Sequence, residues 1–256
     1  ASDEHERELG ATNALALALL DERRRGTKSF WAPYLAMLPA SKFGTPITFN
    51  TSEREALYGT HVLEWAMARE ANIARTHSFL LSREGHGGGA SSTPILWHTA
   101  IEAQALSAMS APSFDDLNWA LSITWSRGHA VNMRAVRGLG AAKRPGLVPI
   151  GDLFNHADHA NVISTSDPVA GMFDFFATQP ISVDEEAFLS YSLQGEPSNA
   201  KLLLDYGFCI PYNLHDEVAI TLHVTDINNS ATNFNAVDQL LRALQLHEFA
   251  RSARLS

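Results

Sequence analysis

Residues Gly151–His156, with the sequence GDLFNH, decide how the rest of this 256-residue chain is interpreted. They follow an apolar run that ends at Ile150, and they open a segment of short apolar runs that reaches Phe208. Asp, Asn, His and Tyr side chains are threaded through these runs, so a core is expected to hold them in place. We therefore expect the functional groups of the chain to lie between Gly151 and Phe208.

The composition describes a globular protein with an acidic surface. Of its residues, 45% are hydrophobic and 18% are charged, which is enough for one large domain or two smaller ones. The formal net charge is −9 and no dense cluster of Lys and Arg appears, which argues against nucleic acid as a partner. No apolar run reaches transmembrane length and the first residues lack the pattern of a secretory signal. We therefore expect an intracellular protein without a membrane partner.

The single cysteine, Cys209, excludes an intrachain disulfide and favours a reducing compartment. Its neighbours Phe208 and Ile210 are apolar, which predicts a buried thiol. We expect no nucleophilic role for a thiol in such surroundings.

Helical patterns fill the chain before about residue 130. A helix is predicted over Thr12–Arg25, where three arginines precede Gly26, and a short apolar helix is predicted within Ser29–Pro39. A capping box, with Ser52 as the N-cap and Glu55 three residues later, begins the next helical region.

Three more helices are predicted before the pattern changes. The apolar spacing predicts helices over Gly59–Leu81 and Ile95–Met109, with a glycine-rich connector at residues 85–92 between them. Ser113, followed by Asp116 three residues later, caps a helix that runs to about Arg127.

Short strands dominate after that point, which predicts an α+β fold. The expected strands are Leu147–Ile150, Met172–Ala177, Ala187–Tyr191 and Val218–Val224. A helix over residues 198–206 is expected to have Ser198 at its N-cap, and a final helix is expected over Val237–Arg251.

A metal site is one interpretation of four neighbouring residues, Asp152, His156, Asp158 and His159. Carboxylate and imidazole groups bind several divalent ions, but this spacing matches no zinc motif. We therefore expect no metal, a hydrogen-bonded His156 and a solvated His159. A metal-dependent hydrolase built on Asp152, His156 and His159 stays open as an alternative.

The ordered set of motifs resembles the SET-domain protein methyltransferases of the Rubisco large-subunit methyltransferase type. The resemblance covers most of residues 12 to 220, and its pieces are specific only in combination. These pieces are Leu15–Glu22, Ser29–Pro39, Ser52–Leu57, Trp119–Ser122, Ser126–Arg127, Asp152–His156, Ser190–Tyr191 and Ser198–Phe208. The resemblance implies an α+β SET-domain fold of short β-strands, with a helical insert and a helical C-terminal lobe.

The resemblance also divides the chain. Residues 1–45 are the helical N-terminal part of the SET region, 46–112 the helical insert and 113–208 the SET core with the cofactor and catalytic motifs. Residues 209–256 are the start of a C-terminal substrate-binding lobe, which we expect to be incomplete. The family carries a Gly-x-Gly cofactor loop before its first helix, and we expect that loop to lie outside this sequence.

S-adenosylmethionine is the cofactor that the resemblance implies. Asn155 and His156 would bind it through main-chain and side-chain hydrogen bonds, and Phe208 would pack on its adenine. The guanidinium of Arg127 would hold the carboxylate of the cofactor, because a guanidinium is the fitting partner for a carboxylate. Tyr191 would be the catalytic tyrosine beside the methyl-transfer channel.

The residues expected around the methyl acceptor give mixed indications of whether the acceptor is lysine or histidine. Tyr206 would line the channel of a substrate lysine, with Asp152 nearby. His129 stands where lysine methyltransferases of this group usually have phenylalanine, and the related actin histidine methyltransferase has a polar residue there that contacts its target imidazole. Gly151 stands where that enzyme has tryptophan, and we expect the small residue to leave room for a long lysine.

The implied function is S-adenosylmethionine-dependent N-methylation of a lysine side chain in a protein substrate, by in-line transfer. Two alternatives within the same fold are a histidine acceptor and a non-catalytic SET-like module that binds proteins. We expect the protein to be a monomer.

Overall fold

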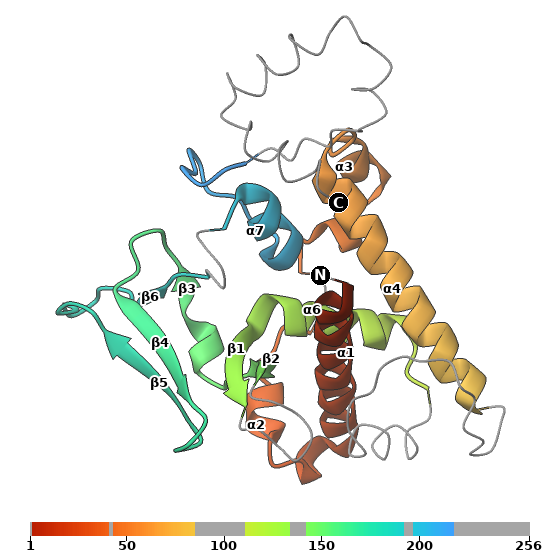
Figure 1. The fold of residues 1–256 in the computed structure, drawn as a ribbon, viewed down its shortest axis with the longest axis horizontal. Helices are drawn as coiled ribbons and strands as arrows, with labels where there is room; N and C mark the ends of the chain where they lie inside the picture. The colour runs from red at the N-terminus through yellow and green to blue at the C-terminus, as the bar shows by residue number, and fades with distance from the viewer. Residues whose placement is uncertain (1, 41–42, 85–110, 134–141, 192–196, 218–256) are drawn as a thin grey trace, which may run out of the picture. The chain divides into compact units, whose positions relative to one another are not determined.

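The computed structural model describes residues 2–40, 43–84, 111–133, 142–191 and 197–217, which lie within one unit that ends at Glu217 (Figure 1). Its α-helices are α1 (Ser2–Arg25), α2 (Ala32–Leu35), α3 (Thr51–Glu55), α4 (His61–Glu84), α6 (Phe114–Arg127) and α7 (Asn199–Tyr206). The 3-10 helices are η1 (Gly26–Lys28), η2 (Pro46–Thr48) and η3 (Gly151–Leu153). The predicted helix at residues 95–109, the connector at 85–92 and the strand and helix after residue 217 lie outside the described residues.

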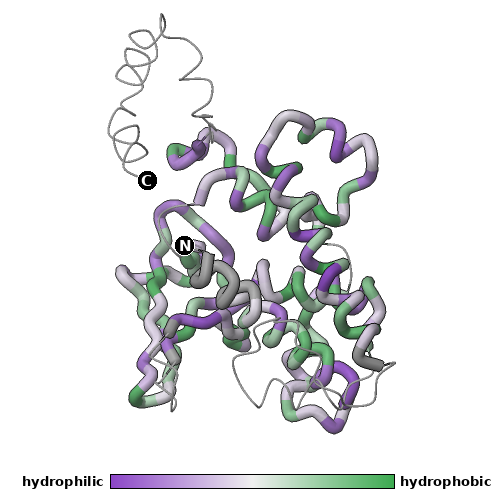
Figure 2. The backbone as a smooth tube through the Cα atoms, turned by 45° about the vertical axis from the view of Figure 1, so that its right-hand side comes forward, coloured by the Kyte–Doolittle hydropathy of each residue, from purple (hydrophilic) through white to green (hydrophobic). Residues whose placement is uncertain are grey.

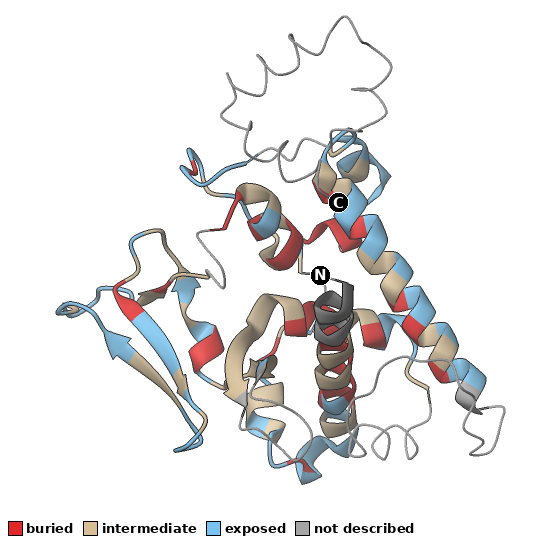
Figure 3. Ribbon diagram, in the orientation of Figure 1, coloured by how far each residue is buried: buried red, intermediate tan, exposed pale blue. Residues whose placement is uncertain are grey.

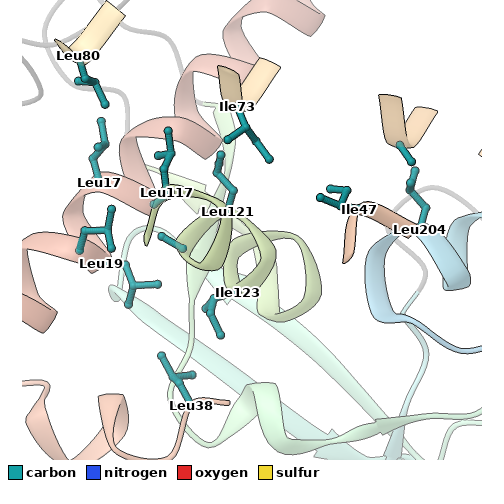
Figure 4. Packing of buried hydrophobic residues seen from close by; sticks show 14 residues of the cluster. Leu17, Leu19, Leu38, Ile47, Ile73, Leu80, Leu117, Leu121, Ile123 and Leu204 are labelled. Atoms are coloured by element: carbon teal, nitrogen blue, oxygen red, sulfur yellow. The ribbon is translucent and has the colours of Figure 1, made fainter. Parts of the chain in front are cut away.

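The main core forms where α6 contacts both α1 and α4 (Figure 4). Leu17 of α1, Ile73 of α4 and Leu117 and Leu121 of α6 are 3% exposed or less. Full burial of each such side chain contributes roughly 1.5–3 kcal/mol to folding. Figure 3 shows the buried positions recurring along the helix faces that turn toward this core, which is the pattern that the helical spacing predicts.

Two helix starts test the predicted capping signals. Ser113 caps α6 as expected, because its Oγ accepts a hydrogen bond of 3.1 Å from the backbone N–H of Asp116. The prediction that Ser52 caps the next helix is wrong. Asn50 is the N-cap of α3, since its Oδ1 accepts from the Glu53 N–H at 3.0 Å and Glu53 Oε2 accepts from the Asn50 N–H at 2.8 Å.

Two small sheets complete the fold. In the first, β1 (Gly128–Met133) pairs antiparallel with β2 (Ala142–Leu147). The second has the strand order β3-β6-β4-β5, with β3 (Asn155–His156), β4 (Val162–Asp167), β5 (Met172–Ala177) and β6 (Phe188–Leu189). Helices and short strands together make the α+β architecture that the sequence predicts.

The strand predictions are partly confirmed. β5 has the predicted bounds, and β6 lies inside the predicted Ala187–Tyr191. The prediction of a strand over Leu147–Ile150 is wrong: β2 ends at Leu147, and Ile150 has φ 74°, a left-handed value that a β-branched residue rarely adopts. Asp152 N–H bonds the Val148 carbonyl at 3.1 Å, so this segment turns into η3.

Helix α7 brings the last part of the site into place. Ser198 caps its start as predicted, and Gly207 ends it in the left-handed conformation with φ 81°. Arg69 of α4 fixes the helix end, because it donates to the Leu204 carbonyl at 3.0 Å and forms an ion pair with Asp205. The chain then leaves α7 at Phe208.

Two surface features complete the description of the fold. Cys209 is exposed, so the prediction of a buried thiol is wrong. Its apolar neighbour Phe208 is itself 36% exposed, and an apolar neighbour in sequence therefore does not mark a buried position here. No helix in the described part of the chain is long and apolar enough to cross a membrane, and Figure 2 shows hydrophilic and hydrophobic residues mixed along it.

Candidate active site

A cavity of about 200 Å³ lies where the C-terminal end of α6 meets β1, η3, β6 and α7. Five of the predicted site residues line it: Arg127, His129, Asp152, Tyr191 and Tyr206. They come from four segments of the chain, because Arg127 and His129 are two residues apart, and the fold brings these segments together. The cavity therefore collects the acceptor and catalytic residues that the sequence predicts.

Asp152 is the buried charge of this cavity, with a side chain that is 0% exposed. Its Oδ2 accepts a hydrogen bond of 2.6 Å from the Tyr34 hydroxyl, and Arg127 Nη1 lies 3.6 Å from the same oxygen. Arg127 Nη1 also donates to the Asp152 carbonyl at 2.9 Å. Among the described residues nothing hydrogen-bonds to Oδ1, and a buried carboxylate oxygen left in that state is costly. Asp152 thus places a buried negative charge, with one unpartnered oxygen, in the wall of the cavity.

Tyr34 completes this group, although no pattern in the sequence indicates a role for it. Burial, followed by the hydrogen bond and negative charge of Asp152, raises the pKa of Tyr34. The phenol therefore stays protonated at neutral pH and acts as a donor to Asp152. The contact spans 118 positions in the chain, so sequence spacing contains no signal for it.

Tyr191 is held at both ends. Its hydroxyl donates to the Phe154 carbonyl at 2.7 Å, and its backbone N–H donates to His156 Nδ1 at 3.1 Å. Its ring lies 4.4 Å from the ring of Tyr206, centroid to centroid. Burial raises the pKa of Tyr191 and of Tyr206, so both phenols keep their protons at neutral pH.

The predicted cofactor residues His156, Asn155 and Phe208 lie beside the cavity. The His156 side chain is 1% exposed, and its ring centroid lies 5.2 Å from Tyr191 and 6.3 Å from Phe208. Because His156 Nδ1 accepts an N–H, its proton belongs on Nε2, 3.5 Å from Asp158 Oδ1, which is longer than a normal hydrogen bond. Asn155 is exposed and donates to Glu186 Oε1 at 2.6 Å.

These contacts bear on the metal alternative. The predicted hydrogen bond of His156 is confirmed, and His159 is exposed. Asp152 faces Tyr34 and Arg127, while His156 faces Tyr191. No group of three or more His, Cys, Asp and Glu residues in the described ranges could hold a metal ion. The arrangement gives no support to the metal-dependent hydrolase.

His129 occupies an aromatic corner of the cavity. Its ring centroid lies 5.2 Å from Phe173 and 5.9 Å from Phe175, both edge-on. Burial lowers the pKa of His129, although the negative charge of Asp152 and a hydrogen bond with the Gly151 backbone act in the opposite direction. A neutral ring therefore faces the cavity, with one nitrogen that donates and one that accepts.

The space beside Gly151 differs from the prediction. A Cβ atom at this position would lie 2.2 Å from Cζ of Phe175, so the phenyl ring already fills that space. The expectation that Gly151 leaves room for a long lysine is therefore wrong, because the space beside Gly151 is not empty. Sequence reasoning missed Phe175 because β5 and η3 are distant in the chain.

Asn161 is a second residue that the sequence did not reveal. It is 4% exposed, and it fixes β6 by accepting from the Phe188 N–H at 2.7 Å and donating to the Glu186 carbonyl at 3.0 Å. Since Tyr191 follows β6 by two residues, this amide helps to set the position of the predicted catalytic tyrosine.

Comparison with known proteins gives sequence relatives that are named Actin-histidine N-methyltransferase. No model of a known protein family matches the chain. The chain is 28% identical over 212 residues to Actin-histidine N-methyltransferase of Xenopus tropicalis. This alignment covers 82% of this chain and 32% of that protein. The protein of the same name from Homo sapiens is 27% identical over 213 residues, covering 83% and 32%. The chain thus spans about a third of the length of these curated relatives.

Solved structures give the fold. The structure of Rubisco LSMT bound to AdoMet matches with a TM-score of 0.53 and 22% identity, over 77% of this chain and 39% of that chain. The SET domain of LSMT bound to lysine and AdoHcy matches with a TM-score of 0.51 and 23% identity, over 77% and 40%. The chain has the SET-domain fold and is related to the actin-histidine N-methyltransferases.

Proposed function

We propose that this chain carries the catalytic core of an S-adenosylmethionine-dependent protein methyltransferase. The observation that carries the proposal is the cavity in which Arg127, Asp152, Tyr191 and Tyr206 meet within a SET-domain fold. The activity named for the sequence relatives supports the reaction class, and the AdoMet bound to the matching Rubisco LSMT supports the cofactor.

The residues beside Tyr191 fit the cofactor. Phe208 has an exposed ring for an adenine, Asn155 has an exposed amide for hydrogen bonds, and Arg127 has a cation for a carboxylate. When bound, S-adenosylmethionine supplies a methyl group on a positively charged sulfur.

The chain's own residues would align the acceptor and keep water out. Tyr191, anchored by Phe154, has an oxygen that can accept weak C–H···O contacts from an electron-poor methyl group. Asp152, held by Tyr34 and Arg127, keeps a buried negative charge in the wall beside the acceptor. Burial in the cavity favours the neutral form of the acceptor, which is the form that attacks.

We propose a histidine imidazole as the acceptor. A neutral imidazole attacks with one nitrogen and must place the N–H of the other against a hydrogen-bond acceptor. The neutral His129 ring, whose other nitrogen bonds the Gly151 backbone, offers such an acceptor in the cavity wall. The names of the relatives point to the same acceptor.

Lysine is the second candidate. Its support is the contacting pair of aromatic rings, Tyr191 and Tyr206 with centroids 4.4 Å apart, which form a wall against which an aliphatic chain can pack, together with the lysine bound in the matching SET domain of LSMT. The glycine at residue 151 adds no support, because Phe175 fills the space beside it.

Two measurements test the proposal. Isothermal titration with S-adenosylmethionine should show binding, and absence of binding would remove the enzyme function. Incubation of the protein with methyl-labelled S-adenosylmethionine and a native cell extract, followed by mass spectrometry, should place the label on a protein histidine. Label on lysine would select the second candidate.

A further inference from the structure

Gly151 and Phe175 are complementary in shape. A Cβ atom at residue 151 would lie 2.2 Å from Cζ and 2.6 Å from Cε2 of Phe175, and 3.1 Å from Cγ1 of Val148. The first two distances are far shorter than any normal contact between carbon atoms. Gly151 belongs to η3 and its φ is not positive, so its backbone conformation suits any residue. Glycine is required here because the ring of Phe175 needs the space.

Phe175 stands behind the wall of the cavity. Its ring centroid lies 5.1 Å from Phe154, 5.3 Å from Phe173 and 5.9 Å from His129. These three residues and Gly151 line the cavity, whereas Phe175 belongs neither to its lining nor to the core between α1, α4 and α6. One phenyl ring of β5 therefore supports four residues of the cavity wall.

One of the four residues that Phe175 supports is His129, the residue proposed to face the acceptor. Phe175 contacts His129 edge-on, with 79° between the ring planes, and Phe173 holds the same imidazole at 64°. Edge-to-face contacts of this kind contribute to packing beyond the area that they bury. Together with the hydrogen bond to the Gly151 backbone, these two contacts give the imidazole of His129 a defined orientation.

We propose that Phe175 is a specificity-determining positioning residue, which acts through His129 and Gly151 to shape the cavity wall for a flat imidazole acceptor. The inference rests on the proposed function, because it concerns the acceptor of the same reaction. Removal of the ring opens the space beside Gly151 and frees the His129 side chain. A longer and more flexible lysine then gains room, and histidine loses its oriented partner.

The test compares acceptor selectivity in four variants, with two peptides that carry histidine or lysine at the methylated position. Phe175→Ala should lower the ratio of kcat/KM for histidine over lysine by about tenfold or more, the scale of a changed pocket wall. Gly151→Ala should lower both rates by about tenfold or more, because the new methyl group displaces the ring. The double variant should regain much of the rate that Gly151→Ala loses.

The matched control is Phe176→Ala, the next residue of β5, whose side chain is 51% exposed. It should keep the wild-type ratio. S-adenosylmethionine affinity should stay within a few-fold in every variant. If Phe175→Ala does not fold, Phe175→Leu keeps most of the volume and should lower the ratio by about threefold.

Three results would overturn the inference. These are an unchanged ratio in the folded Phe175 variant, an equal shift in Phe176→Ala, and a double variant no more active than Gly151→Ala. A wild-type protein that transfers no methyl group would overturn the proposed function as well. An active wild type with an unchanged ratio in the Phe175 variant would overturn only the selectivity role.

Discussion

The Tyr34 hydroxyl donates a hydrogen bond of 2.6 Å to Oδ2 of Asp152, a residue 118 positions further along the chain. This contact joins α2, near the start of the chain, to η3 in the wall of the cavity. Because the Asp152 side chain is 0% exposed, the phenol replaces water that the carboxylate loses on folding.

Tyr34→Phe should lower the free energy of unfolding by about 1–3 kcal/mol, because it removes a donor from a buried charged group. Urea denaturation measures the change. Tyr58→Phe is the matched control, since that side chain is 86% exposed, and it should leave the stability unchanged. Equal stability of Tyr34→Phe and wild type would show that the carboxylate does not need this bond.

Arg127→Ala should weaken the binding of S-adenosylmethionine by about 1–3 kcal/mol, the cost of a lost charge-assisted hydrogen bond. Isothermal titration measures the affinity. The control is Arg75→Ala, an exposed arginine of α4, which should bind the cofactor as the wild type does. Unchanged affinity in the Arg127 variant would remove this residue from the cofactor site.

His129 should make the stability depend on pH. Burial lowers the pKa of His129, so as the pH falls below about 6.5 the unfolded chain binds a proton that the folded protein does not. Above about pH 6.5 His129 is neutral in both states, so its stability contribution is fully present there. The protein becomes less stable as the pH falls from that value toward the lower pKa that His129 has in the folded state.

Denaturation curves between about pH 7.5 and 5 measure this dependence. His129→Gln should flatten it, whereas His159→Gln, which changes an exposed histidine, should not. A His129→Gln variant with the same loss of stability on acidification as the wild type would contradict the assignment.

Gly207→Ala should destabilise the protein more than an ordinary glycine replacement in a left-handed turn. Residue 207 has φ 81°, and an added Cβ would lie 2.4 Å from the carbonyl oxygen of Phe43. Gly171→Ala is the matched control, because its φ is 68° and nothing lies within 4 Å of the added atom. The control should cost about 1 kcal/mol and Gly207→Ala clearly more, in urea denaturation. Equal costs would mean that the close approach of residue 43 is relieved easily.

Local signals made much of the fold predictable. Ser113 and Ser198 were identifiable as N-caps, since a side chain that bonds a backbone N–H three residues later leaves a pattern within one turn. The prediction at Ser52 was wrong because Asn50 offers the same chemistry two residues earlier. At Leu147–Ile150, apolar composition predicted a strand, but the chain must turn there to present Asp152 to Arg127.

The positions of the candidate site were predictable where family motifs mark them, while the roles of those residues stay predictions. Positions that only tertiary contacts bring to the site were not predictable. Five predicted residues line the cavity. Tyr34 and Phe175 stayed hidden, because each acts on a residue that is distant in the chain and neither has a spacing that indicates its partner. Gly151 was noticed as a small residue, but only the position of Phe175 reveals what fills the space.

The most direct test of the central claim is methyl transfer by Tyr191→Phe compared with the wild type, using labelled S-adenosylmethionine and the protein substrate found in extract. We expect the wild type to transfer the label. The variant should transfer the label much more slowly, because it lacks the hydroxyl oxygen beside the methyl group and its anchor at Phe154, with cofactor affinity within a few-fold of the wild type. A wild type that binds the cofactor but transfers nothing would indicate the non-catalytic module. A variant with wild-type turnover would contradict the assignment of Tyr191.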